Sequence, residues 1–436
     1  MAGIFDALQA GIADVAPVRA IGRVVETGRG TFLVAGLAQA ALGDRVLAET
    51  GAGPLGGEIV RLSAKGATIL PEDDPEGLTI GAKVELIGPT WIAPDHSWLG
   101  RIVDPLGQPL DGRPLMRGAV RRPMNAGPPP AASRRTMGER LTTGVAVFDT
   151  LLPLVRGQRI GLFAGSGVGK SSLLAKFARG VSADVAVIAL VGERGRELRD
   201  FTDRVLGREG MARSVVITAT SDQSPLMRRR CALSAMAVAE HFRDQGLHVL
   251  LLVDSVTRYA EAHREVALAS GESASLRGYP PSTAHAIMSL AERAGPGADT
   301  SGDITAVFSV LVAGSDMEEP VADIIRGTLD GHVVLDRKIA ERGRYPAIDL
   351  LRSVSRSLPD AASSAENAMI LDARRTLGAY DRAEMMVQAG LYVPGTDAAV
   401  DRAIRLWPGL DGFLAEESPP GGAAASFDRL QACLKG

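Results

Sequence analysis

The stretch GLFAGSGVGKSSLLAKFARG, residues 161–180, combines a glycine-rich turn with a lysine and two serines. An apolar run that ends at Ala164 predicts a buried strand, and the glycines after it let the backbone turn tightly with its N–H groups pointing inward. A helix is predicted to follow, and helix N-termini attract anions. The pattern predicts a loop that binds phosphate groups, formed by Gly165, Ser166, Gly167, Val168, Gly169, Lys170, Ser171 and Ser172.

Two residues of this loop have side chains suited to a nucleotide with its metal ion. Lys170 would reach the β- and γ-phosphates, and the hydroxyl of Ser171 would ligate Mg²⁺. The alternative is a glycine-rich turn that joins a strand to a helix without a ligand. Ala164 at the first position of the pattern weakens the match slightly, whereas lysine and serine stand where phosphate chemistry needs them.

Two carboxylates follow apolar runs further along the chain. VAVIALVGE ends at Glu193, and HVLLLVD ends at Asp254. Ligands gather at the carboxyl ends of parallel strands, where Asp254 would hold Mg²⁺ and Glu193 would activate a water for attack on the γ-phosphate. Either acid alone is more typical of a helix cap or a solvated turn. Together with the loop, they predict hydrolysis of a nucleoside triphosphate.

Composition limits the class of protein. The 436 residues carry a net charge of −3 and 4% aromatic residues, which does not favour binding to nucleic acid. The two cysteines, Cys231 and Cys433, indicate free thiols. No apolar stretch approaches the ~18 residues of a membrane span, and the N-terminus has no charged region of a signal peptide. We therefore expect a cytoplasmic protein.

The order of patterns predicts an α/β protein with several parts. Short β-rich runs between glycine turns indicate a small barrel over residues 19–95. Residues 96–144 are rich in Pro, Gly and Arg and are predicted to form an extended linker. Alternating strand-like and helical runs over 145–358 predict a parallel sheet covered on both faces. Residues 359–436 are predicted to be helical, and residues 1–18 form a further helical segment.

The N-terminal segment GIFDALQAGIADV is amphipathic. It places Ile4, Phe5, Leu8 and Ile12 on one face of a helix. Two interpretations stay open: the helix docks on a partner, or it packs on the barrel of its own chain.

Five motifs along the chain resemble those of one protein family and occur in the same order as in that family. They are WLGRIVDPLGQPLDG, GERGREL, DSVTRYA, RGYPPST and ADIIRGTLDGHVVLDRKIAERGRYPAIDLLRSVSR. Over residues 19–415 the chain resembles the rotary ATP synthase superfamily, most closely the type III secretion ATPases of flagella and injectisomes. SDQSPLMRRRCA and RAIRLWPGLDGFLAE look more like the flagellar export ATPases. The resemblance implies a RecA-like P-loop NTPase core between an N-terminal β-barrel and a C-terminal helical domain.

The resemblance also implies roles for single residues. Glu193 matches the family's catalytic carboxylate, and Arg194 belongs to the network that positions it. Arg258 matches the arginine that contacts the γ-phosphate or the carboxylate. Tyr345 matches the aromatic residue that stacks on adenine, and Arg356 matches the finger donated to the neighbouring subunit's nucleotide.

Because one chain carries both Glu193 and Arg356, the resemblance implies a homohexameric ring that hydrolyses ATP with Mg²⁺. The implied function is protein export by the flagellar type III apparatus, at the cytoplasmic side of the inner membrane. The implied partners are a stator or regulator subunit, a coiled-coil stalk protein, chaperone–substrate complexes and the membrane export gate, with no nucleic acid. The alternatives are an injectisome ATPase, an RNA translocase similar to the termination helicases, and a nucleotide-binding subunit that does not hydrolyse.

Overall fold

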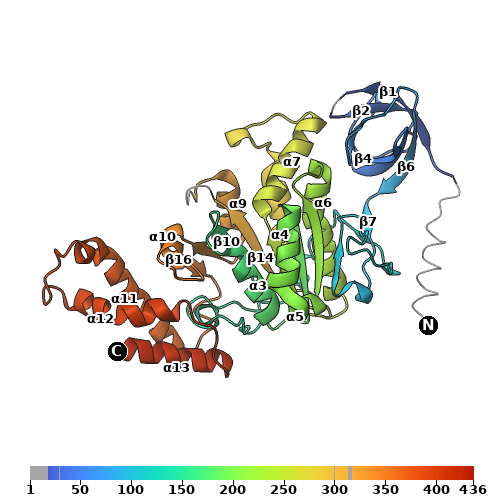
Figure 1. Cartoon of the computed structure of the whole chain (residues 1–436). Helices are drawn as coiled ribbons and strands as arrows, with labels where there is room; N and C mark the ends of the chain where they lie inside the picture. Colours follow the sequence, from blue (N-terminus) through green and yellow to red (C-terminus); the bar gives the residue numbers. More distant parts are fainter. Residues whose placement is uncertain (1–17, 29, 299, 313–316) are drawn as a thin grey trace.

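The computed structural model describes residues 18–28, 30–298, 300–312 and 317–436 (Figure 1). It confirms the predicted fold class, with an N-terminal β-barrel, a central sheet with helices and a helical C-terminal part. The predicted helical segment 1–18 lies outside these residues except for Val18. Among the helices described, none is both long and apolar enough to cross a membrane.

Six antiparallel strands close the barrel in the order β1-β2-β5-β4-β3-β6. Alternate residues point inward, as in β1, where Val24 is buried and Arg23 and Val25 are exposed. The barrel is filled by apolar side chains such as Phe32 and Ile69. The strands are β1 (Ile21–Thr27), β2 (Phe32–Ala35), β3 (Asp44–Thr50), β4 (Gly53–Ser63), β5 (Gly66–Pro71) and β6 (Lys83–Pro89).

The central sheet has eight strands in the order β16-β15-β10-β14-β13-β11-β12-β8. All neighbours pair in parallel except β16, which is antiparallel to β15 at one edge. The strands are β8 (Arg101–Val103), β10 (Arg159–Ala164), β11 (Val185–Glu193), β12 (Ser214–Thr220), β13 (Val249–Asp254), β14 (Ile304–Leu311), β15 (Gly331–Leu335) and β16 (Ile348–Ser355). One of them, β8, comes from within the predicted linker.

Both faces of the sheet are covered, which explains why its strands read as continuous apolar runs. In β11, Val187 and Ala189 pack into one core while Ile188 and Leu190 pack into the other. The first core contains residues of α6 (Pro225–Arg243), α7 (Val256–Ser270), α8 (Ser282–Glu292) and α9 (Pro320–Thr328). The second contains residues of α2 (Ala146–Asp149), α3 (Lys170–Gly180), α4 (Gly195–Asp200), the π-helical turn η3 (Phe201–Leu206), α5 (Gly207–Ala212) and α10 (Arg337–Glu341).

The C-terminal helices are α11 (Ser364–Gln388), α12 (Ala398–Phe413) and α13 (Gly422–Lys435). Ser363 and Glu366 form a capping box at the start of α11. Arg374 fastens the same helix to the sheet, because its guanidinium donates to the carbonyl oxygens of Leu350 and Ser353. The remaining short elements are β7 (Trp91–Ile92), β9 (Arg122–Pro123), η1 (His96–Trp98), η2 (Ala131–Ser133) and η4 (Leu276–Gly278). The domain boundaries given above stay a prediction.

Candidate active site

The predicted phosphate-binding loop joins β10 to α3 at the carboxyl end of the central sheet. Gly167 and Gly169 have φ angles of 79° and 86°, in the left-handed region that glycine adopts without strain. Gly169 is the N-cap of α3, so the free N–H groups of the helix begin at Lys170. Val168 is buried, and the rest of the predicted set is partly buried or exposed: Gly165, Ser166, Ser171 and Ser172.

Lys170 and Asp254 meet at the foot of this loop. The Lys170 Nζ contacts Oδ1 of Asp254, which ends β13 and is only 3% exposed. The same oxygen accepts a hydrogen bond of 2.7 Å from the hydroxyl of Ser309 on β14, the strand between β10 and β13. The Asp254 carboxylate and the Ser171 hydroxyl are hard oxygen ligands of the kind that Mg²⁺ takes alongside phosphate. The two residues fit a magnesium site.

Glu193 ends β11, the strand next to β13. Burial raises the pKa of its carboxyl to about 7; the negative charge of Asp254 and a hydrogen bond and charge from Glu197 act in the same direction, and Lys170 opposes them. A carboxylate whose pKa is near the working pH is suited to accept a proton from water. The geometry thus places a carboxylate suited to this role at the end of the strand beside β13.

A bulge in β11 at Gly192 lies beside the side chain of Arg258. The register with β12 shifts between Val191 and Glu193, and Gly192 has a φ of 69°. A Cβ on Gly192 would lie 3.7 Å from Cδ of Arg258, so the Arg258 side chain packs beside the residue before Glu193. Arg258 pairs with Glu261 at 3.1 Å, while its buried Nε has no hydrogen-bond partner in the described part of the chain. The N–H is thus buried and unpartnered among the described residues.

Arg194 follows Glu193 directly and is the N-cap of α4. Its Nη1 lies 3.4 Å from Oε1 of Glu197, and its side chain is 67% exposed. Arg194 therefore contacts the glutamate that helps raise the pKa of Glu193, rather than Glu193 itself.

Tyr345 lies against the phosphate-binding loop, although it is 175 positions after Lys170 in the sequence. Its ring carbon Cδ1 is 3.0 Å from the point where a Cβ on Gly169 would stand. Half of the Tyr345 surface is exposed. An exposed aromatic face next to the loop can stack on a planar base.

Arg356 lies at the opposite end of the sheet. Ala164, just before the loop, pairs with Leu335, whereas Gly331 at the other end of β15 pairs with Ser355. The four residue steps from Gly331 to Leu335 span ~13 Å, and the loop and Arg356 lie beyond the two ends. Arg356 is exposed, and its side chain forms no hydrogen bond or ion pair with the described residues. The structure brings together the other predicted residues but not this one.

Sequence reasoning missed two residues of the site. Ser309 is a polar residue in the apolar run ITAVFSVLVAG, which is a signal for a buried polar role. Glu197 stands four residues after Glu193, so a helix that began one residue earlier would place the two acids on one face. Neither signal identifies the residue that Ser309 or Glu197 contacts.

Comparison with known proteins agrees with this geometry. Residues 144–355 match the nucleotide-binding domain of the ATP synthase alpha/beta family, and residues 362–432 match the T3SS EscN ATPase C-terminal domain. The flagellum-specific ATP synthase of Caulobacter vibrioides is 45% identical over 390 residues, which are 88% of this chain and 88% of that protein.

Solved structures of a relative extend the likeness to the whole fold. Assembled EscN from the type III secretion system of enteropathogenic E. coli has a TM-score of 0.87 and 33% identity, over 95% of this chain and all of that chain. EscN in complex with its central stalk EscO gives a TM-score of 0.86 with the same identity and coverage. The chain is therefore an ATPase of the ATP synthase alpha/beta family, in its group of flagellum-specific and type III secretion ATPases.

Proposed function

We propose that this ATPase hydrolyses ATP with Mg²⁺ in a homohexameric ring and drives protein export by the flagellar type III apparatus. The observation that carries the proposal is the placement of Glu193 and Arg356 at opposite ends of one sheet. An arginine side chain is too short to cross the more than ~13 Å to the loop of its own subunit. In a head-to-tail ring, each Arg356 would instead face the loop of the next subunit.

The side chains at the loop end suggest an order of events. In the structure, Lys170 is paired with Asp254. When ATP binds, we expect Lys170 to turn to the β- and γ-phosphates, which frees the Asp254 carboxylate to hold Mg²⁺ together with Ser171. The ion would neutralise the charge that develops on the phosphate oxygens.

The remaining predicted residues complete the roles in this proposal. Glu193 accepts the proton of the attacking water, and Arg258 uses its unpartnered Nε–H and its guanidinium at the γ-phosphate. Arg194 holds Glu197 and so tunes Glu193. Tyr345 stacks on adenine, and Arg356 stabilises the transition state in the neighbouring subunit.

The partners follow from the resemblance and from the relatives. EscN is found assembled and in complex with its central stalk EscO, which supports a ring and a coiled-coil stalk here. Met385, Met386, Leu391 and Val393, which are at least half exposed near the end of α11, give an apolar surface for that stalk. We further propose a stator or regulator subunit, chaperone–substrate complexes and the export gate, placing the ring in the cytoplasm at the inner membrane.

Flagellar use is favoured over injectisome use by the 45% identity to the flagellum-specific enzyme, against 41% to the type 3 secretion system ATPase of Xanthomonas euvesicatoria and 33% to EscN. The decisive experiment measures phosphate release by the purified chain, alone and with either RNA or a coiled-coil export protein. We expect basal release that the coiled-coil protein stimulates and RNA does not. Stimulation by RNA alone would identify an RNA translocase instead, and absence of release at high protein concentration would contradict hydrolysis.

A further inference from the structure

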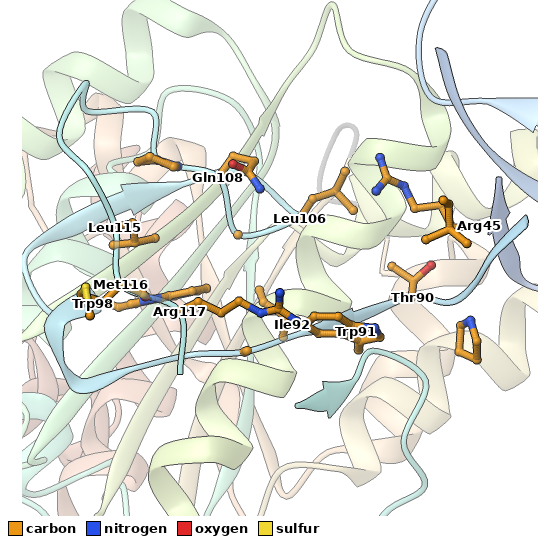
Figure 2. A pocket seen from close by; sticks show the side chains of 15 residues that line it. Arg45, Thr90, Trp91, Ile92, Trp98, Leu106, Gln108, Leu115, Met116 and Arg117 are labelled. Carbon is orange, nitrogen blue, oxygen red and sulfur yellow. The ribbon is translucent and has the colours of Figure 1, made fainter. Parts of the chain in front are cut away.

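A groove of 520 Å³ lies between the end of the barrel and the segment that follows it. Figure 2 shows Arg45 and Thr90 at its barrel end, Trp91 and Ile92 along its floor, and Trp98 at the other end. None of these residues belongs to the nucleotide site. The groove therefore lies outside the candidate active site.

The floor of the groove is apolar and firmly held. Trp98 is 2% exposed, and its Nε1 donates a hydrogen bond of 2.6 Å to the carbonyl oxygen of Met116. The guanidinium groups of Arg117 and Arg121 lie 4.0 and 4.3 Å from the centre of the Trp91 ring. Most of the described lining residues are apolar, and the lining residue Arg45 is already paired with Glu72 at 2.7 Å. Such a surface suits an apolar segment.

The described chain begins at the mouth of this groove. Ile21 pairs with Glu85 in antiparallel register, and the carbonyl of Ala20 accepts a hydrogen bond of 2.9 Å from Leu86 N–H. Leu86 is followed directly by Ile87, which lines the groove. The described chain therefore approaches β1 one residue away from a lining residue of the groove.

We propose that residues 4–12 of the same chain occupy this groove. Residues 1–17 lie outside the described part of the chain, and their sequence has the required chemistry. Ile4, Phe5, Leu8 and Ile12 share one helical face, and residues 4–12 carry one aspartate, Asp6, and no lysine or arginine.

The connection between segment and groove is short enough. The five residues from 13 to 17 span up to ~17 Å when extended, so the apolar face can turn back from Val18 onto Ile87 and the tryptophans. Tethering raises the local concentration of the segment into the ~mM range, so even a modest contact would be well populated. A segment held in this way is withheld from other partners until one competes for it. This inference does not depend on the proposed function.

Hydrogen exchange of the full-length chain tests the proposal. Ile87→Asp places a charge in the groove, and Ile80→Asp is its matched control, because both isoleucines are exposed on the barrel but only Ile87 lines the groove. We expect the amides of residues 4–12 to be protected in the wild type and in Ile80→Asp. In Ile87→Asp they should exchange about tenfold faster, since one buried apolar contact is lost.

A second pair of variants tests the segment itself. Leu8→Asp should remove the protection of residues 4–12 and increase the exposure of Trp91, whereas Ala10→Asp, on the opposite helical face, should not. Protection that falls on dilution would assign the groove to a second copy of the chain. Protection that is unaffected by Ile87→Asp, or absent from the wild type, would overturn the proposal and leave the groove to a different partner.

Discussion

The two ends of the central sheet differ in how their charged side chains are held. At the loop end, Lys170, Asp254 and Glu193 lie close together, and burial and mutual charge set the pKa of Glu193. At the far end, Arg356 is exposed, and its guanidinium has no ion pair within the described residues. The contacts at the loop end lie within one chain. At the far end, the exposed guanidinium of Arg356 is open to a contact with another chain.

This difference has a physical basis. A buried charge needs a partner, because leaving it uncompensated in the protein interior is costly. Asp254 accordingly receives both Lys170 and Ser309. An arginine exposed to water keeps its hydration and needs no partner, so Arg356 can remain unpaired in a single subunit. If Arg356 completes the site of a neighbouring subunit, we expect an isolated chain to bind nucleotide and to hydrolyse it slowly.

Changing Lys170 should have the largest effect, because it disrupts the loop end in both binding and turnover. Lys170→Ala removes the only side-chain cation that the loop offers to the phosphates and leaves Asp254 without its ion pair. We expect weak nucleotide binding and no measurable phosphate release. Lys176→Ala, on the same helix and with a side chain that is 30% exposed, is the control and should keep normal activity. A normal kcat in Lys170→Ala would contradict the prediction that this loop binds the phosphates of the nucleotide.

Arg356→Ala tests the far end. The chain should bind ATP almost normally, yet hydrolysis should fall ~10³–10⁵-fold, the usual contribution of an arginine finger. Arg352→Ala, on the same edge strand, is the matched control.

Mixing decides whether Arg356 acts within or between subunits. In rings of Arg356→Ala and Glu193→Gln chains, some interfaces pair an intact Glu193 with an intact neighbouring Arg356. Two inactive proteins should therefore recover partial activity. No recovery at any mixing ratio, with mixed rings confirmed by native mass spectrometry, would show that the finger acts in cis or not at all.

Glu193→Gln separates binding from chemistry at the loop end. The carboxamide keeps the shape of the side chain but cannot accept the proton of water, so hydrolysis should fall ~10²–10⁴-fold while ATP binding is retained. Steady-state phosphate release and equilibrium binding of a fluorescent ATP analogue measure the two quantities. Hydrolysis within about tenfold of the wild type, a change of under ~1.4 kcal/mol in the barrier, would mean that Glu193 is not the base.

The sequence predicted the loop end better than the relation between the two ends. The phosphate-binding loop, Glu193 and Asp254 each follow a local pattern, in which an apolar strand comes directly before the functional residues. The contact of Tyr345 with Gly169 and the remote place of Arg356 depend on the antiparallel strand β16, for which no local pattern exists. The assigned roles of these residues remain predictions.

The same limit applies to the fold. The class of the fold and the barrel could be predicted from alternating patterns and glycine turns. The strand β8 could not, because its three residues are held by pairing with β12 and by the ion pair of Arg101 with Asp111, both outside its own sequence. Short edge elements are specified by the surface they join rather than by their own residues.

The smallest expected effect is a shift in the pH profile, which sharpens the description of the loop end. Because the pKa of Glu193 is raised to about 7, the wild-type rate should increase as pH rises through about 7 and the base loses its proton. Glu197→Gln removes one negative charge that raises this pKa. The pKa of Glu193 should then fall, and the acidic limb of kcat should move to lower pH, with little change at pH 8. Burial and Asp254 remain, so the shift should be partial.

Glu209→Gln, which removes an acid of α5 that does not influence Glu193, should leave the acidic limb of kcat in place. Because the residual activity of Glu193→Gln has no carboxylate to titrate, its profile should be flat over the same range. A limb that stays fixed in Glu197→Gln, or persists in Glu193→Gln, would show that another group controls the rate.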